Sequence, residues 1–181
     1  MQPSKSTQPS TDRGRAAAGR DAVQLLIADH REVKSLFTAY EKLAENKAPA
    51  DDRQLMATQI CVLLTLHTHI EEEIFYPAAR QALDEEGDDL LNEAEVEHAG
   101  AKNLIRELKA MQASDEMYDA KVKVLGEMID HHVGEEENEL FPKVKRTSLD
   151  LAELGDRMDA RKKELLASPQ PLEPLPNELP H

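Results

Sequence analysis

The stretch "LHTHIEEEIFYP", residues 66–77, contains two histidines, three glutamates and a proline. Imidazole nitrogen and carboxylate oxygen both bind metal ions, so any of these five side chains is a candidate ligand. On an α-helix, residues four apart differ by about 40° around the axis. His67 and Glu71 therefore share one face, together with apolar neighbours such as Leu64. His69 lies about 200° from His67, which directs it outward or toward another neighbour.

A second stretch, "HVGEEENELFP" at residues 132–142, matches "HTHIEEEIFYP" at residues 67–77 without gaps. The first histidine, the glutamate four residues later and the final proline coincide in the two stretches. His132 and Glu136 thus share an apolar helix face in the same way. A repeated histidine-glutamate frame at a fixed distance from an aromatic-proline end is more specific than the acidic residues alone. The repeat selects these two positions as ligands.

The rest of the chain predicts an all-α fold, because apolar residues recur at helical spacing and strand signals are almost absent. We expect helices over 21–46, 51–83, 88–111 and 114–146, and a shorter fifth helix over about 149–166. Asp51 or Asp52 and Ser114 are candidate N-caps, and Gly87 fits a position just after a helix end. Four long helices with short connections predict an up-down-up-down four-helix bundle. The expected organisation is a disordered N-terminal tail (1–20), the bundle (21–146), an additional C-terminal helix (147–167) and a flexible Pro-rich tail (168–181).

Composition narrows the class of partner. The net charge of −14 disfavours nucleic acid and anionic membrane surfaces, which require a basic face. Cys61 is the only cysteine, so the sequence provides no disulfide framework and no cysteine-based zinc site. No apolar run reaches the length of a membrane span, and the first residues do not form a secretory signal. A cytoplasmic protein is therefore the expectation, and no protein partner is indicated.

The other two long helices each offer one histidine among apolar residues, His30 and His98. A carboxylate buried among leucine and isoleucine is costly without a cation or another partner. Nitrogen and oxygen ligands without a thiolate suit iron best, with manganese or zinc as alternatives. Two carboxylates can bridge two ions while each ion takes two imidazoles. The predicted dinuclear site consists of His30, His67, Glu71, His98, His132 and Glu136.

Four segments, "DHREVKSLF", "LHTHIEEEIFYP", "EVEHAGAKNL" and "HHVGEEENELFP", resemble the hemerythrin-like, or HHE cation-binding, domain family. The resemblance covers about residues 21–146. It implies a four-helix bundle with a non-haem di-iron centre between the helices. It also implies the same six residues as ligands.

The sequence departs from the oxygen-carrying hemerythrins at two positions. Ala94 stands where those proteins have a further histidine on the third helix. Glu136 follows its histidine by four residues, whereas they have an aspartate at five. The missing histidine argues against reversible oxygen carriage and leaves a coordination position open to water, peroxide or Glu95.

Three functional hypotheses follow. The first is a di-iron protein that binds or reacts with dioxygen, peroxide or nitric oxide, for sensing or detoxification. The second is an iron-binding storage or regulatory module without turnover, and the third is a metal-free helical interaction module. The sequence does not decide whether the protein is an enzyme. Several nearby side chains are interpreted as packing residues, or as charges that are solvated or orient a ligand: Tyr40, Tyr76, Tyr118, His69, His131, Glu72, Glu73, Glu135 and Glu137.

Overall fold

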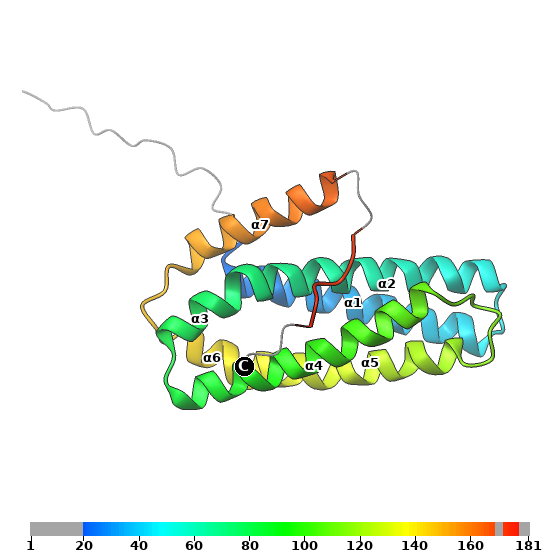
Figure 1. Ribbon diagram of the computed structural model, residues 1–181, viewed down its shortest axis with the longest axis horizontal. Coiled ribbons are helices and arrows are strands. Elements are labelled where there is room, and N and C mark those ends of the chain that lie inside the picture. The colour runs from blue at the N-terminus through cyan, green and yellow to red at the C-terminus, as the bar shows by residue number, and fades with distance from the viewer. Residues whose placement is uncertain (1–19, 169–171, 178–181) are drawn as a thin grey trace, which may run out of the picture.

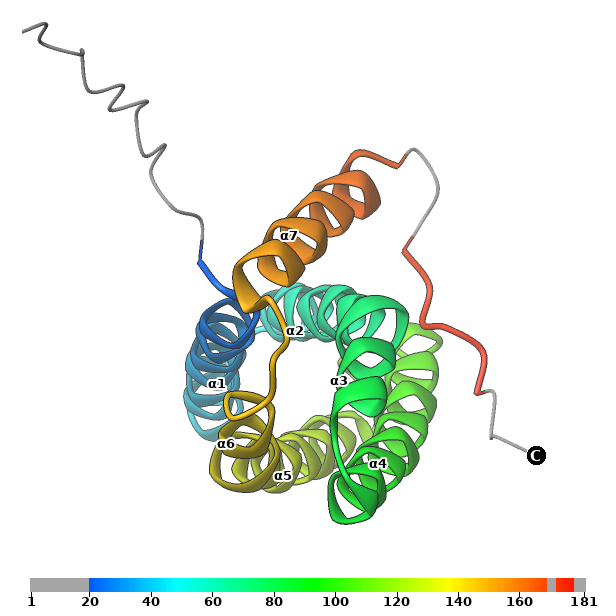
Figure 2. The ribbon, with the colours of Figure 1, turned by 90° about the vertical axis from the view of Figure 1, so that its left-hand side faces the viewer.

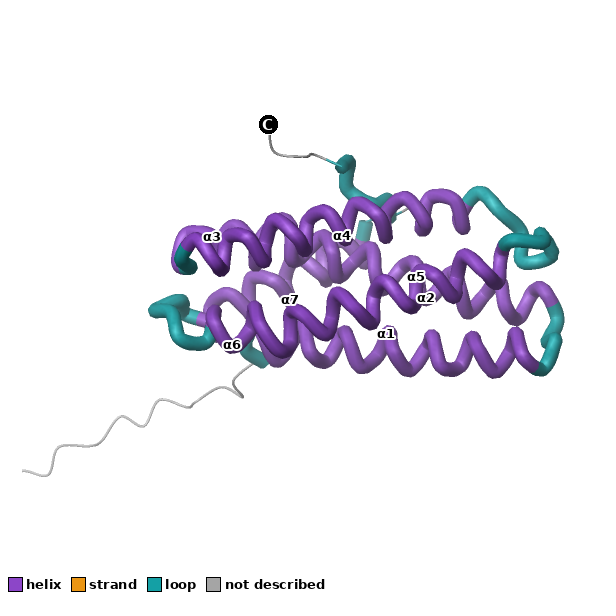
Figure 3. The backbone as a smooth tube through the Cα atoms, turned by 90° about the horizontal axis from the view of Figure 1, so that it is seen from below, coloured by secondary structure: helices purple, strands orange, loops and turns teal. Residues whose placement is uncertain are grey.

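The computed structural model describes residues 20–168 and 172–177, and this part of the chain is helical with no strand (Figure 3). The predicted disordered N-terminal tail lies outside the described residues except for Arg20, as do 169–171 and 178–181 of the Pro-rich tail. The elements in chain order are α1 (Ala22–Glu45), α2 (Ala50–Ile70), the π-helical turn η1 (Glu71–Phe75), α3 (Tyr76–Ala82), α4 (Glu85–Lys109), α5 (Tyr118–Glu135), the π-helical turn η2 (Glu136–Leu140), α6 (Phe141–Val144) and α7 (Leu151–Ala167).

The predicted four-helix bundle is confirmed. α1, α4 and two composite rods, α2–η1–α3 and α5–η2–α6, run alongside one another (Figure 1). Seen end-on, the four rods surround a common interior, and α7 lies outside this ring against α1 and α2 (Figure 2). The short helices α3 and α6 extend the second and fourth rods beyond the π-helical turns. The fold therefore has four rods, each contributing one face to a shared core.

Two helix starts follow the capping rules directly. Asp21 accepts a hydrogen bond from the Gln24 backbone N–H at 2.8 Å, and the Gln24 side chain in turn accepts one from the Asp21 backbone. This reciprocal capping box fixes the start of α1. Asp150 caps α7 by accepting from the backbone N–H groups of Ala152 and Glu153.

The predicted helix ends lie within one to four residues of the observed ones, but the predicted N-caps of the second and fourth rods are wrong. α2 begins at Ala50 after Pro49, so Asp51 and Asp52 lie in its first turn instead of capping it. There they favourably face the positive end of the helix dipole. Ser114 does not cap the fourth rod, because α5 begins only at Tyr118.

Gly87 likewise does not follow a helix end but lies in the first turn of α4. Its backbone N–H donates to Asp84 Oδ1 at 3.1 Å, so the preceding aspartate caps a new helix. The sequence "DEEGDD" therefore begins a helix, where glycine alone indicated an end.

The two π-helical turns occupy equivalent places in the repeat. In η1 the backbone N–H of Tyr76 bonds to the carbonyl of Glu71, and in η2 that of Phe141 bonds to the carbonyl of Glu136. Residues five apart lie about 140° apart on a regular α-helix. A hydrogen bond spanning five residues instead returns them to nearly the same face. In these two rods, the π-helical turn thus places an aromatic ring on the same face as the glutamate.

The core consists of two apolar clusters. One, at the end covered by α7, includes Leu26, Phe75, Tyr76, Leu91 and Phe141. The other, toward the opposite end, includes Val33, Ile60, Leu64, Ile105 and Leu125. Buried histidines and glutamates form a polar layer of the bundle, described below.

The C-terminal region packs against the bundle. Leu154 and Met158 of α7 are buried in the first cluster. Residues 172–177 lie beside α2 and α4 in an extended conformation, and basic side chains bind their carbonyl oxygens. Lys109 donates to Leu172 O at 3.0 Å and Arg106 to Leu175 O at 2.9 Å.

None of the helices in residues 20–168 is both long enough and apolar enough to cross a bilayer.

Glycine 155 allows α7 to approach the start of α1 closely. A Cβ atom there would lie 2.4 Å from the carbonyl oxygen of Arg20 and 2.8 Å from the backbone nitrogen of Ala22. We predict that Gly155→Ala lowers the free energy of unfolding by about 1–3 kcal/mol, because backbone atoms must move apart. The matched control is Gly134→Ala in α5, where nothing lies within 4 Å of the added atom. That variant should gain about 0.5–1 kcal/mol.

Thermal or urea unfolding of the two variants measures this difference. Equal stability of Gly155→Ala and the natural protein would show that α7 does not pack closely at this point.

Candidate metal centre

The six predicted ligands converge in the polar layer, and each is at most 5% exposed. Their imidazoles form two pairs. The Nε2 atoms of His30 and His67 lie 3.2 Å apart, and those of His98 and His132 lie 3.1 Å apart. One pair comes from α1 and α2, and the other from α4 and α5. The four rods therefore supply one histidine each at a single depth.

The two glutamates lie between the pairs. Oε2 of Glu71 is 3.1 Å from His67 Nε2 and 3.4 Å from His98 Nε2. Oε2 of Glu136 is 3.2 Å from His30 Nε2 and 3.5 Å from His132 Nε2. Each carboxylate thus contacts one histidine of each pair, as a ligand that bridges two ions would.

The donor spacing fits metal ions. An ion about 2.1 Å from two donors that are about 90–110° apart leaves those donors about 3.0–3.4 Å from each other. The contacts above range from 3.1 to 3.5 Å. Two groups of mutually close ligand atoms result, His30 with His67, Glu71 and Glu136, and Glu71 with His98 and His132. Glu71 belongs to both groups.

Glu71 is fully buried, and its polar neighbours include the Nε2 atoms of His67 and His98. Its side chain is 0% exposed, and neither carboxylate oxygen makes a hydrogen bond within the described residues. An ionised carboxylate in this setting carries a large desolvation penalty unless a cation compensates it. A metal ion held by Glu71 and the neighbouring imidazoles would provide that compensation.

A carboxylate faces the outer nitrogen of each imidazole. Nδ1 of His30 lies 2.9 Å from Glu137, Nδ1 of His98 lies 2.9 Å from Glu72, and Nδ1 of His132 lies 2.8 Å from Glu97. Such a partner fixes the proton on Nδ1 and leaves Nε2 free to bind a metal.

The fourth histidine, His67, faces Oδ2 of Asp29 at 3.6 Å, which is longer than a hydrogen bond. The four carboxylates occupy two kinds of position in the sequence. Glu72 and Glu137 are matched positions, and Asp29 and Glu97 each precede a ligand histidine.

The two central carboxyl groups have opposite pKa shifts. Burial, and then the charge of Glu136, raise the pKa of Glu71 well above its usual range. Burial also acts to raise the pKa of Glu136, but His132 and His30 outweigh it and lower that pKa below its usual range. In the metal-free protein Glu136 is therefore ionised and Glu71 retains its proton at the pH where free glutamate has lost it.

Burial lowers the pKa of His98 to about 4, although its hydrogen bond to Glu72 opposes the shift. His98 is therefore neutral near pH 7, the form that binds metal. For His132 burial acts in the same direction, but the charge of Glu136 and the hydrogen bond to Glu97 raise its pKa overall.

Tyr76 is a site residue that the sequence reasoning assigned only to packing. Its hydroxyl donates to Glu136 Oε1 at 2.9 Å and lies 3.3 Å from His98 Nε2. The ring stacks on His98 with centroids 5.4 Å apart. Phe141, the matched residue of the repeat, stacks on His30 at 5.9 Å but has no hydroxyl.

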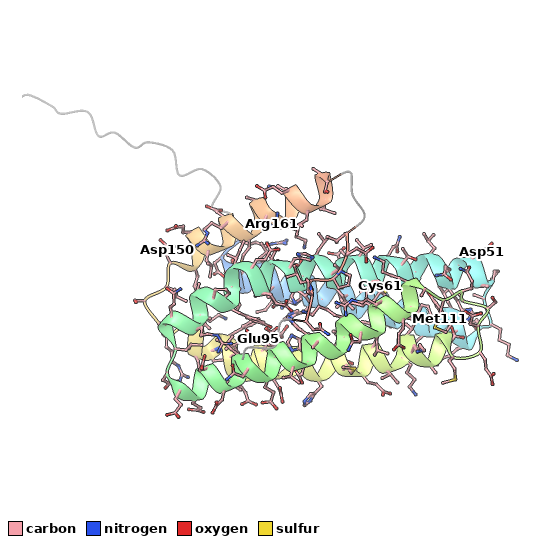
Figure 4. All side chains as sticks on the ribbon, viewed as in Figure 1. Asp51, Cys61, Glu95, Met111, Asp150 and Arg161 are labelled. Carbon is pink, nitrogen blue, oxygen red and sulfur yellow. The ribbon has the colours of Figure 1, made fainter. Side chains whose placement is uncertain are left out.

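Glu95 does not occupy the position that Ala94 leaves open. Its carboxylate binds Arg80 at 2.9 Å, and its side chain is 30% exposed on α4 (Figure 4). The alternative of Glu95 as a ligand is therefore wrong in this structure.

A small cavity adjoins the site, with a volume of about 10 Å³, roughly the space of one water-sized molecule. Its lining combines site histidines with apolar side chains, including Val33, Leu64, Ile129 and Val133. The free space therefore admits only a very small ligand.

His69 faces away from the six residues, as predicted, but it does not lie on the surface. It is 6% exposed, and contacts Glu73 at 3.0 Å through Nδ1 and the carbonyl oxygen of Glu173 at 2.9 Å through Nε2. Its partner is the C-terminal segment, which helical periodicity alone does not reveal. His131 is largely exposed and contacts Glu97, the residue that holds His132.

Residues 21–144 match the model of the hemerythrin HHE cation-binding domain. The chain belongs to this family. The match covers the four rods and all six converging residues, and it ends before α7.

Known proteins similar to this hemerythrin HHE-domain chain fall into two groups. A DNA nickase of Nostoc sp. is 32% identical over 117 residues, which cover 65% of this chain and 31% of that protein. The chain therefore spans about a third of that relative. An uncharacterized protein of Mycobacterium tuberculosis is 25% identical over 155 residues, covering 82% of this chain and 89% of the relative.

Among solved structures, a hemerythrin HHE cation-binding domain-containing protein from Mycobacterium kansasii has a TM-score of 0.64 at 24% identity. The match covers 80% of this chain and 86% of that one. This likeness supports the fold.

We predict that His67→Ala or His132→Ala removes most of the bound metal, because each change deletes one of two imidazoles from a pair. His69→Ala should leave the metal content nearly unchanged, because His69 faces the C-terminal segment. Elemental analysis of the three purified variants checks this. Loss of metal in the His69 variant together with normal content in the His67 variant would contradict the assignment.

The pKa of Glu71 predicts a pH dependence. A raised pKa in the folded state stabilises the metal-free protein below about pH 4.5, the usual glutamate value, and this contribution is lost as pH rises through the folded-state pKa. A metal ion must displace the same proton, so its affinity should increase with pH. We expect the metal-induced rise in melting temperature to be larger at about pH 8 than at about pH 5.

Melting curves with and without zinc, measured in the natural protein and in Glu71→Gln, test this pH dependence. The variant carries no titrating group at this position and should lose most of the difference between the two pH values. An equal pH effect in both proteins would assign it to the histidines instead.

Proposed function

We propose that this protein holds two iron ions between its four rods and uses them to bind or react with dioxygen, peroxide or nitric oxide. The observation that carries the proposal is the buried carboxylate of Glu71, which makes no hydrogen bond in the described residues and lies between two histidine pairs. In the proposed site His30 and His67 hold one ion, and His98 and His132 hold the other. Glu71 and Glu136, each in contact with one histidine of each pair, would supply carboxylate oxygens to the site.

Iron is the favoured metal because the donors are nitrogen and oxygen without a thiolate. When bound, two ferrous ions supply the electrons and the open coordination positions that reduction of a small oxygen species requires. Manganese and zinc fit the same donors, but zinc has no redox chemistry.

The surroundings of the site favour a small ligand. The adjoining cavity of about 10 Å³ has room for a molecule the size of water, and apolar side chains line it. Larger substrates are excluded by size, and bulk water is limited. The Tyr76 hydroxyl lies 3.3 Å from His98 Nε2 and donates to Glu136, so the site contains a buried proton donor.

Nucleic acid is not part of the proposal. The Nostoc relative is a DNA nickase, but this chain spans only 31% of it. A net charge of −14 opposes binding to a phosphate backbone. We place the activity in the cytoplasm and in sensing or detoxification of the small ligand.

An alternative is iron binding without turnover, as a store or regulatory module. The contacts of α7 and residues 172–177 with the bundle favour it, because such C-terminal elements can transmit the state of the site.

Purification without oxygen, followed by metal analysis, tests for two irons per chain. Peroxide is then added to the ferrous protein, and peroxide loss is followed together with visible absorbance. We expect sustained loss over many equivalents, which His132→Ala should abolish. Oxidation that stops after the irons are consumed would favour storage or sensing, and absence of bound metal would refute the proposal.

Tyr76→Phe is the informative variant, since phenylalanine already occupies the matched position 141. It should keep both irons and lose about tenfold or more of the peroxide turnover if the hydroxyl supplies a proton. Unchanged turnover would show that the Tyr76 hydroxyl supplies no proton and that the residue only packs against the site.

A further inference from the structure

Helix α7 lies beyond the region that matches the family, yet two consecutive basic residues connect it to the bundle. Arg161 binds Glu73 through two nitrogens, at 2.6 and 3.1 Å, and Figure 4 labels it on α7. Lys162 donates to Asp29 Oδ1 at 2.6 Å. The first contact anchors α7 to the second rod, and the second reaches the residue next to His30.

The contact with Lys162 is partly buried, since its side chain is 19% exposed and that of Asp29 is 13% exposed. The other oxygen of Asp29 faces Nδ1 of His67 at 3.6 Å. Both of these facing atoms are buried, and neither has a hydrogen-bond partner within the described residues. Asp29 is therefore the polar group available to orient His67, and Lys162 is the cation that holds Asp29.

A comparable arrangement occurs across the site. Lys102, which is 3% exposed, binds both oxygens of Glu72 at 3.0 Å, and Glu72 binds His98 Nδ1 at 2.9 Å. In each half of the site, therefore, a lysine contacts a carboxylate, and that carboxylate faces a histidine. Lys102 belongs to α4 inside the bundle, whereas Lys162 comes from the additional helix α7.

We propose that Lys162 is a positioning residue for the ion held by His30 and His67, and that α7 completes this half of the metal centre. The inference rests on the proposed metal binding. Without the lysine, the carboxylate of Asp29 would be left partly buried without its cation, a state that favours rotation toward solvent. His67 would then lose the group that orients its ring and increases its basicity.

Lys162→Met tests the role of the lysine, and Lys163→Met is the matched control. Lys163 is the next residue on the same helix, is 72% exposed and, within the described part of the chain, forms an ion pair with Asp159 of α7 alone. The Arg161–Glu73 contact remains in both variants and keeps α7 attached.

Cobalt(II) titration of the metal-free protein, followed by visible absorbance and calorimetry, provides stepwise affinities for two ions. In Lys162→Met we expect one ion to bind about tenfold more weakly and the other to be unchanged, as for other residues that orient a metal ligand. Lys163→Met should resemble the natural protein in both steps. The melting temperature of metal-free Lys162→Met should lie slightly below that of Lys163→Met, because only the first change leaves a partly buried carboxylate without its cation.

A combined variant tests whether Lys162 acts on the ion through Asp29. Asp29→Asn should weaken the same ion, and adding Lys162→Met to it should cause no further loss, because both changes remove one interaction. Equal weakening of both ions together with a much lower melting temperature would show a merely structural role. Unchanged affinities in Lys162→Met would show that Asp29 does not depend on the lysine, and either result overturns the inference.

The same titration separates this inference from the proposed function. If the natural protein takes up no cobalt(II), the dinuclear site itself is refuted. If it takes up two ions and Lys162→Met takes them up equally well, only the role of α7 is refuted.

Discussion

The burial of two carboxylates at the centre of a four-helix bundle is the constraint on which the structure depends. Glu71 and Glu136 are at most 2% exposed, and four imidazoles surround them. Without a cation the layer reaches a compromise, in which Glu136 remains ionised and Glu71 keeps a proton. Neither oxygen of Glu71 has a hydrogen bond of good geometry within the described residues, so a cation bound beside it would offset the cost of its burial.

Helical periodicity predicted the bundle and the convergence of the six residues because they lie on regular α-helix or within one turn of it. His67 to Glu71 and His132 to Glu136 span the last α-helical turn before each π-helical turn. Beyond that point the assumption of 100° per residue fails. Tyr76 lies about 140° from Glu71 on a regular helix, yet the π-helical turn returns it to the glutamate face. The aromatic-proline pair at the end of both repeats was the sequence feature that could have drawn attention to Tyr76.

The outer carboxylates could not be predicted by the same method, since each one serves a histidine on another rod. Asp29 precedes His30 but faces His67, and Glu97 precedes His98 but binds His132. Such contacts depend on the register between helices, which the periodicity of a single helix does not define. Lys162 was still less predictable, because α7 is separated from the first helix by most of the chain. An acidic residue directly before His30 and another directly before His98 were the visible traces of this arrangement in the sequence.

The repeat makes the two halves of the site alike, and the differences between them are therefore informative. Phe141 covers His30 with a hydrocarbon ring, whereas Tyr76 presents a hydroxyl beside His98 and Glu136. The half with the hydroxyl is also the half in which alanine replaces a possible third histidine. The hydroxyl and the small side chain at position 94 thus both belong to the half formed by His98 and His132. The half formed by His30 and His67 has neither feature: Phe141 packs on His30, and Lys162 of α7 binds Asp29, the carboxylate that faces His67.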